Sequence, residues 1–176
     1  QASWATGRVL IRRGWPLLLA GFSVMLYTKS DQVMLEWLRG PAEVGQYSVA
    51  VRVAESLYFL PVVLSSTFLP RIGQGSGSFE TDPGLRQLYR TAWLLGVAMM
   101  LTSMLVLPPL VPLVFGEEFL PAQTSLVFLG PAAFAVATGC ASGAWLNTQG
   151  HQKIIAQRSA IGALVNIFLN LLLIPR

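Results

Sequence analysis

The chain alternates long apolar runs with short polar connections, and five of these runs are long enough to cross a lipid bilayer as helices. A helix needs about 20 predominantly apolar residues to span the hydrocarbon of a membrane. The pattern predicts spanning helices at residues 15–38, 42–69, 85–114, 121–147 and 154–174. These runs lack the strict period-2 alternation that membrane β-strands require. The sequence therefore predicts an all-α, polytopic membrane helix bundle.

Helix-breaking residues separate the predicted helices or disturb them. Gly40-Pro41 divides the first from the second, and a polar, Gly-rich segment at 73–84 divides the second from the third. Pro61 lies inside the second helix, where its missing N–H frees a carbonyl and invites a kink. Pro108 and its neighbour strain the far end of the third helix. The short connections predict that successive helices pack as antiparallel neighbours.

Composition supports a membrane location and excludes several other classes. Hydrophobic residues make up 53% of the chain and charged residues 11%, about half the soluble average of roughly 25%. The net charge of +4 comes from scattered basic residues, so no basic stripe for nucleic acid is formed. Cys140 is the single cysteine, which excludes a disulfide framework or a cysteine metal cluster. The chain begins at Gln1 without a signal peptide, and we expect it to be part of a longer protein.

Basic residues fall mostly on one side of the predicted bundle, which sets its orientation. Eight of them share that side: Arg8, Arg12, Arg13, Arg71, Arg86, Arg90, Lys153 and Arg158. The opposite side carries Arg39 and Arg176 together with the acidic pair Glu117-Glu118. The positive-inside rule then makes the eight-residue side cytoplasmic. We therefore predict a multi-pass protein of the bacterial cytoplasmic membrane, with residues 1–14 as a cytoplasmic leader segment.

Four charged residues interrupt the first two apolar runs at similar depth. Counted at 1.5 Å per residue from the Gly40 turn, Lys29 and Arg52 both lie about 16–18 Å away, near mid-bilayer. Asp31 lies slightly shallower and Glu55 slightly deeper. A charge there costs roughly 2.5–3.5 kcal/mol on insertion scales. Two interpretations remain open. In the first, neutralising pairs fix helix packing: Asp31 with Arg52 or Lys29, and Glu55 with Arg52. In the second, the residues line a hydrated cavity whose cations hold an anionic substrate and whose acids carry a coupling H⁺ or Na⁺.

Other polar and small residues favour packing roles over chemistry. Asn166 and Asn170 lie four apart on the last helix and are predicted to bond to a neighbouring helix. Gly139 and Gly143 form a small-xxx-small pair that allows close approach of two backbones. The sequence contains no phosphate-binding Gly-rich loop, nucleophile elbow or metal-spaced set of ligands. We therefore predict no catalytic residues, no metal and no cofactor, and conclude that the chain is not an enzyme.

Several segments together resemble one known family. They are DQVMLEWLRGPAEVGQYSVAVRVAESLYFLPVVLSSTFLPRI (31–72), VFGEEFLPA (114–122), NTQGHQK (147–153) and GALVNIFLNLLLIP (162–175). Their order and spacing resemble the carboxy-terminal lobe of bacterial polysaccharide flippases in the multidrug/oligosaccharidyl-lipid/polysaccharide exporter superfamily. The resemblance covers nearly the whole chain after Trp15. Within the superfamily, it does not distinguish the O-antigen, capsule, exopolysaccharide and teichoic-type substrates.

The resemblance implies a two-lobe transporter of 12 to 14 helices around a partly cationic cavity, of which this chain supplies about five helices. It also implies that Asp31 and Arg52 line that cavity, with Lys29 and Glu55 as further candidates. Such a protein moves an undecaprenyl-pyrophosphate-linked oligosaccharide across the membrane by alternating access. Two alternatives are a drug/cation antiporter of the same superfamily and a membrane-embedded polysaccharide polymerase or transferase. The antiporter favours unpaired cavity acids, and the polymerase needs a long catalytic loop.

Overall fold

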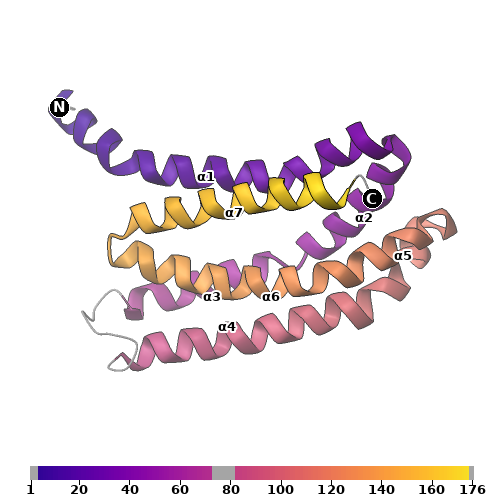
Figure 1. Cartoon of the computed structure of the whole chain (residues 1–176). Helices are drawn as coiled ribbons and strands as arrows, with labels where there is room; N and C mark the ends of the chain where they lie inside the picture. Colours follow the sequence, from indigo (N-terminus) through magenta and orange to yellow (C-terminus); the bar gives the residue numbers. More distant parts are fainter. Residues whose placement is uncertain (1–3, 73–81, 175–176) are drawn as a thin grey trace. The chain divides into compact units, whose positions relative to one another are not determined.

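A computed structural model describes residues 4–72 and 82–174, which form helices joined by short turns (Figure 1). In chain order the elements are α1 (Trp4–Arg39), α2 (Pro41–Glu55), α3 (Phe59–Ile72), α4 (Pro83–Leu101), the π-helix η1 (Thr102–Val106), α5 (Leu107–Phe115), the 3₁₀-helix η2 (Glu117–Phe119), α6 (Leu120–Thr148) and α7 (Gln152–Leu173). No strand occurs within the two described ranges, so the predicted all-α class is confirmed. The chain divides into two compact units, one containing α1 and α7 and the other containing α2 to α6.

Four helical stretches of the described chain have the length and apolar composition needed to cross a membrane. They are Pro41–Pro70, Pro83–Phe115, Glu117–Thr148 and Gln152–Leu172, and they correspond to the second to fifth predicted spans. The first predicted span, 15–38, lies inside α1 but is not one of the four. Five consecutive polar residues, from Thr28 to Gln32, interrupt its apolar character.

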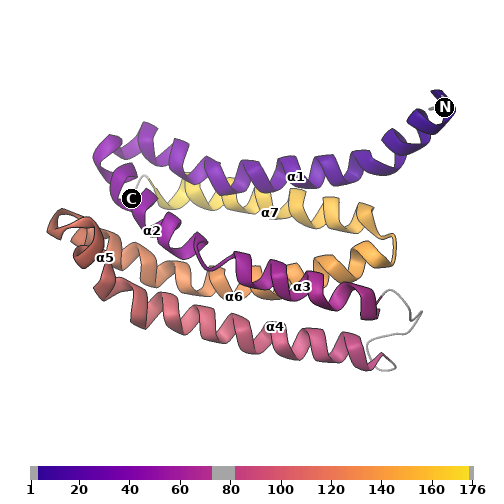
Figure 2. The same ribbon diagram turned by 180° about the vertical axis from the view of Figure 1, so that it is seen from behind.

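The first unit is a pair of parallel helices, α1 and α7, which lie side by side in both views (Figures 1 and 2). The Ser30 hydroxyl donates to Asn166 Oδ1 at 3.1 Å. Near the carboxyl-terminal ends of both helices, Arg39 Nε donates to the Ile174 carbonyl at 2.8 Å. Since both partners advance together along the chain, the two helices run in the same direction. Parallel packing also places the Arg39 cation at the negative end of the α7 dipole, which stabilises that end.

Small side chains form the seam between α1 and α7. Ala20 and Ser23 are buried and share a helical face with Ser30, because residues three, four and seven apart lie on one side of a helix. Ala156 and Ala163 are buried on α7 at the matching spacing before Asn166. Membrane helices gain little from burying apolar groups against one another, so close approach through small residues is what gives them van der Waals contact.

The second unit is an antiparallel bundle of three membrane-length helical stretches, α2–α3, α4–α5 and α6 (Figure 1). The α6 helix contacts α2, α3, α4 and α5, so it forms the axis of the unit. Three apolar clusters follow one another along it: Phe68, Ile72, Leu85, Leu88, Ala92 and Ala141; then Met99, Ala133 and Ala137; then Ala50, Ala54, Val111, Ala122 and Leu126. Most of the buried α6 residues in these clusters are alanines, which explains how several helices fit around one axis.

The contact between α4 and α6 is close enough to require glycine. A Cβ added to Gly130 of α6 would overlap Met104 Cγ and lie 3.3 Å from the Met100 carbonyl oxygen. Gly96 of α4 faces Phe134 in the same way, at 2.9 Å. The sequence pointed to the pair Gly139 and Gly143, and the space around the Cβ position of Gly139 is open. Gly130 and Gly96 are therefore points of close approach that the small-residue pattern did not indicate.

Local sequence explains how the second unit makes its turns. Asp82 caps α4 with its Oδ1, which accepts from the N–H groups of Gly84 at 2.8 Å and Leu85 at 3.1 Å. The remainder of the predicted polar connection, 73–81, lies outside the described residues, as does Arg176 of the orientation argument. Gly116 ends α5 with φ of 100°, a left-handed conformation that residues with a Cβ adopt only with strain.

We expect Gly130→Val to destabilise the protein by about 1–3 kcal/mol, because the added methyl groups displace Met104 and overpack the α4–α6 contact. The matched control is Gly139→Val on the same helix, which adds the same atoms to open space and is expected to change stability far less. Thermal unfolding of both purified variants in detergent measures the difference. Equal unfolding temperatures would contradict the assignment of Gly130 as the contact point.

Candidate functional site

The second predicted span breaks at its middle, between α2 and α3. Residues 56–58 form a turn, in which the Leu57 and Tyr58 N–H groups donate to carbonyls only three residues earlier, at 3.1 and 2.9 Å. Pro61 explains the break. It has no N–H for the Leu57 carbonyl four residues before it, and its ring would clash with that carbonyl. The Leu60 N–H bonds to the Leu57 carbonyl instead, at 3.1 Å, which tightens the chain locally.

A second irregularity, the π-helix η1, divides α4 from α5. The Leu107 N–H donates to the Thr102 carbonyl, five residues earlier, instead of the usual four. Pro108 and Pro109 follow immediately and supply no N–H groups to the preceding turn, so the helix widens by one residue to accommodate them. Ser103 is fully buried inside this π-helix, and its hydroxyl donates to the Leu126 carbonyl of α6 at 3.3 Å.

The break and the π-helix both lie in the middle part of the second unit. Leu57 and Tyr58 of the break pack against the cluster of Met99, Ala133 and Ala137, and η1 begins three residues after Met99. Two of the three membrane-length stretches therefore carry non-α backbone at neighbouring levels. Such interruptions weaken a helix locally, and π-turns occur frequently at functional sites.

Arg52 and Glu55 occupy the last turn of α2, immediately before the break. Arg52 is exposed and Glu55 is half-buried. The buried side of α2 carries Ala50 and Ala54, which pack near α6, and the 100° rotation per residue places Arg52 almost opposite to it. Within the described part of the chain, neither charged side chain forms a hydrogen bond or an ion pair. Arg52 therefore points away from the packed core of its unit, and Glu55 lies at the edge of that core.

The polar side chains of the first unit form a cluster across α1 and α7. Asn166 Oδ1 accepts two hydrogen bonds, from the Ser30 hydroxyl at 3.1 Å and from Asn170 Nδ2 at 3.2 Å. All three side chains are part-buried. Ser30 lies between Lys29, which is exposed, and Asp31, whose Oδ1 accepts from the Gln32 N–H at 2.8 Å. The two charges thus flank the point where the α1–α7 seam turns polar.

The sequence-predicted residues divide between the two units. Lys29, Asp31, Asn166 and Asn170 belong to the first unit, and Arg52 and Glu55 belong to the second. The structure brings Asn166 and Asn170 together. Lys29 and Asp31 are the sequence neighbours of Ser30, which donates to Asn166. Asp31 and Arg52 belong to different units, so their predicted pairing stays a prediction. A packing role for the two asparagines likewise stays a prediction.

Sequence reasoning missed Ser30 and the π-helix. The signal for Ser30 was the unbroken polar run from Thr28 to Gln32, of which only the charged members were selected as candidates. The signal for the π-helix was the pair Pro108-Pro109, which predicts strain but not its form. Chemically, the cluster of Ser30, Asn166 and Asn170 presents hydroxyl and amide groups, and Arg52 offers a guanidinium to an anion.

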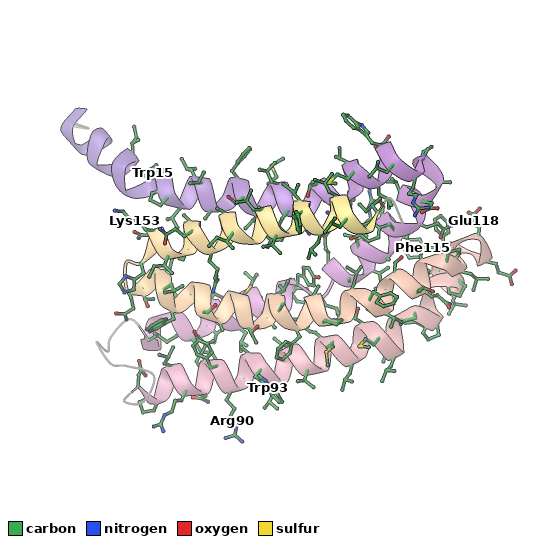
Figure 3. The ribbon with its side chains drawn as sticks, in the orientation of Figure 1. Trp15, Arg90, Trp93, Phe115, Glu118 and Lys153 are labelled. Atoms are coloured by element: carbon green, nitrogen blue, oxygen red, sulfur yellow. The ribbon has the colours of Figure 1, made fainter. Side chains whose placement is uncertain are left out.

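Charge also separates between the two ends of the second unit. The end where α4 begins carries Arg86 and Arg90, and the end where α5 meets α6 carries Glu117 and Glu118. Figure 3 shows Arg90 and Glu118 at these opposite ends. The separation matches what the positive-inside rule expects of a membrane protein whose α4 begins in the cytoplasm. The orientation itself stays a prediction.

Four helical stretches long and apolar enough to cross a bilayer point to a multi-pass membrane protein. The chain belongs to the MatE family, whose model matches residues 16–172. Members of this family are membrane transporters of the superfamily that the sequence motifs resemble, and they are not enzymes. Neither a curated protein nor a solved structure matches the chain significantly.

We expect Ser30 and Asn166 to contribute jointly to stability, because the hydroxyl and amide satisfy each other inside an apolar seam. A double-mutant cycle with Ser30→Ala and Asn166→Ala is expected to give a coupling free energy of about 0.6 kcal/mol, the average for interhelical hydrogen bonds in membranes. Unfolding of the two single variants and the double variant measures it. A cycle of Ser30→Ala with Gln157→Ala, an exposed residue of α7, serves as the control, and a coupling no larger than that control would contradict the bond.

Proposed function

We propose that the protein flips an undecaprenyl-pyrophosphate-linked oligosaccharide across the bacterial cytoplasmic membrane for surface polysaccharide biosynthesis. Family membership makes it a transporter of this superfamily. The motifs between Asp31 and Pro175 resemble the polysaccharide flippases within that superfamily. The observation that carries the proposal is Arg52, a permanently charged side chain that faces away from the packed side of α2 at mid-span.

The chemistry of Arg52 suits a pyrophosphate. A guanidinium presents a planar fork of N–H donors that matches phosphate oxygens two at a time. Its neighbour Glu55 makes no ion pair with it among the described residues, so the Arg52 charge is available for a ligand. Lys29, Asp31 and Glu55 remain further candidates of this proposal, as the sequence resemblance implies.

Coupling to an ion follows from the same residues. Asp31 lies beside the oxygen-rich cluster of Ser30, Asn166 and Asn170, a set of hard ligands suited to H⁺ or Na⁺. A membrane potential supplies about 2.3 kcal/mol per charge per 100 mV, so movement of one charge biases the transport cycle. The break at 56–58 and the π-helix supply the places where helices bend during alternating access.

A drug/cation antiporter of the same superfamily is the alternative, and the half-buried acids Asp31 and Glu55 favour it. The two functions make opposite demands on Arg52, because a cation is repelled by a guanidinium and a pyrophosphate is attracted. A deletion strain separates them. The flippase proposal expects lipid-linked repeat units to accumulate in the cytoplasmic leaflet, and the antiporter expects increased drug sensitivity with normal surface polysaccharide.

When expressed in that strain, the Arg52→Ala variant is expected to insert into the membrane normally but not to restore flipping. Loss of a charge-assisted hydrogen bond lowers affinity for the pyrophosphate roughly 10–100-fold. Arg52→Lys retains the charge without the planar fork and is expected to restore flipping in part. The control is Lys153→Ala, an exposed cation at the start of α7. Labelling of lipid-linked repeat units on each leaflet measures the outcome, and wild-type flipping by Arg52→Ala would rule out the cavity role.

Pro61→Ala tests the helix break separately from the charge. The substitution supplies an N–H for the Leu57 carbonyl, so we expect a more continuous helix and slower flipping. Pro70→Ala, which removes an exposed proline from the same α3, is the matched control and is expected to flip at the wild-type rate. Flipping assays in proteoliposomes compare the two. If Pro61→Ala flips as fast as Pro70→Ala, bending at the break is unnecessary for transport.

A further inference from the structure

The outward face of α4 begins with a basic patch that the transport proposal does not use. Arg86, Gln87 and Arg90 are exposed and, with Pro83, line an open depression of about 470 Å³. Figure 3 shows the Arg90 side chain pointing away from α6. Neither guanidinium forms an ion pair or side-chain hydrogen bond with another described residue. The two charges lie one helical turn apart, a spacing that lets both reach one phosphate group.

The patch is distinct from the helix terminus. Asp82 already accepts the N–H groups of Gly84 and Leu85, so the first turn of α4 is capped by its own carboxylate. A ligand at this position therefore meets side-chain donors and not free backbone N–H groups. Residues 83–101 of α4 include no acidic side chain, and the described acid next to the patch is the capping Asp82.

An apolar strip continues from the patch along the same face of α4. Trp93, Leu94 and Leu101 lie three, four and eleven residues after Arg90, so all three are on the same side of the helix as Arg90. Their exposed fractions are 54%, 55% and 46%. The distance from Arg90 to Leu101 is about 16 Å at 1.5 Å per residue, close to half of the roughly 30 Å hydrocarbon core. The strip therefore matches one acyl chain in one leaflet.

We propose that this face of α4 binds an anionic phospholipid, with its phosphate held by Arg86 and Arg90 and its acyl chain along Trp93, Leu94 and Leu101. Gln87 adds a neutral donor for the headgroup. Trp93 lies one turn deeper than Arg90, the level at which indole rings favour the membrane interface. Trp93 forms a T-shaped pair with Phe134 of α6, with ring centroids 6.1 Å apart, which holds the indole against the bundle.

Charge complementarity selects the lipid class. Two arginines without acidic partners among the described residues attract a net negative headgroup more strongly than a zwitterionic one. The predicted cytoplasmic position of the patch places it beside the leaflet that is rich in anionic lipids. The apolar strip then favours a lipid over a free phosphate, because a soluble anion gains nothing from Trp93 or the leucines.

Native mass spectrometry of the whole purified protein tests the proposal. The probes are phosphatidylglycerol and, for comparison, phosphatidylcholine of the same acyl composition. The wild-type protein is expected to retain phosphatidylglycerol preferentially. Arg86→Gln/Arg90→Gln is expected to lower its affinity for phosphatidylglycerol by about tenfold or more, the loss expected when charge-assisted hydrogen bonds are removed. The matched control is Lys153→Gln/Arg158→Gln, which removes the same charge from α7, and it is expected to leave retention within about twofold of wild type.

Three results overturn the proposal: no loss in Arg86→Gln/Arg90→Gln, an equal loss in the Lys153/Arg158 control, or no preference for phosphatidylglycerol over phosphatidylcholine. Competition with soluble glycerophosphate identifies a free-phosphate site, which also contradicts it. If the glutamine pair fails to fold, Arg86→Lys/Arg90→Lys replaces it and is expected to lose part of the affinity. Trp93→Ala is expected to weaken lipid retention further. The lipid-retention measurement does not involve transport. Its outcome therefore does not depend on whether the flippase proposal is correct.

Discussion

The structure depends on one constraint: inside lipid, every backbone N–H and C=O must find a partner within the protein. Continuous α-helices meet this requirement by themselves. This explains why the described residues are almost entirely α-helical, with only a short π-helix and a short 3₁₀-helix between the α-helices. Proline interrupts this pairing locally, because it has no backbone N–H to donate. At Pro61 the helix breaks and uses shorter-range bonds, and at Pro108 it widens into a π-turn.

In the second unit, the stretches with irregular backbone pack around a helix that has no such interruption. The α6 axis stays α-helical from Leu120 to Thr148, across Pro131, and most of its buried residues are small. The interrupted stretches pack against it and carry the irregular backbone. Arg52 lies next to one interruption on the unpacked side of α2.

The hydropathy pattern was sufficient to predict the fold class and the approximate position of the helices, because the bilayer requirement acts through composition and length. It did not determine how the helices contact one another. Gly130 and Gly139 occupy the same helix in similar surroundings of small residues, and only the position of Met104 decides which one is a contact. Likewise, nothing local to residues 28–32 indicates that Ser30 meets Asn166, because that bond requires the first and last described helices to pack in parallel.

The parallel α1–α7 pair has a consequence for biogenesis. Ser30 and its acceptor Asn166 are 136 residues apart in the chain. At typical translation speeds of 5–20 residues per second, α1 emerges from the ribosome roughly 7–27 s before the part of α7 that completes the pair. During that interval the polar turn from Thr28 to Gln32 has no α7 to shield it. The polar contact between α1 and α7 therefore forms only after the whole second unit has been synthesised.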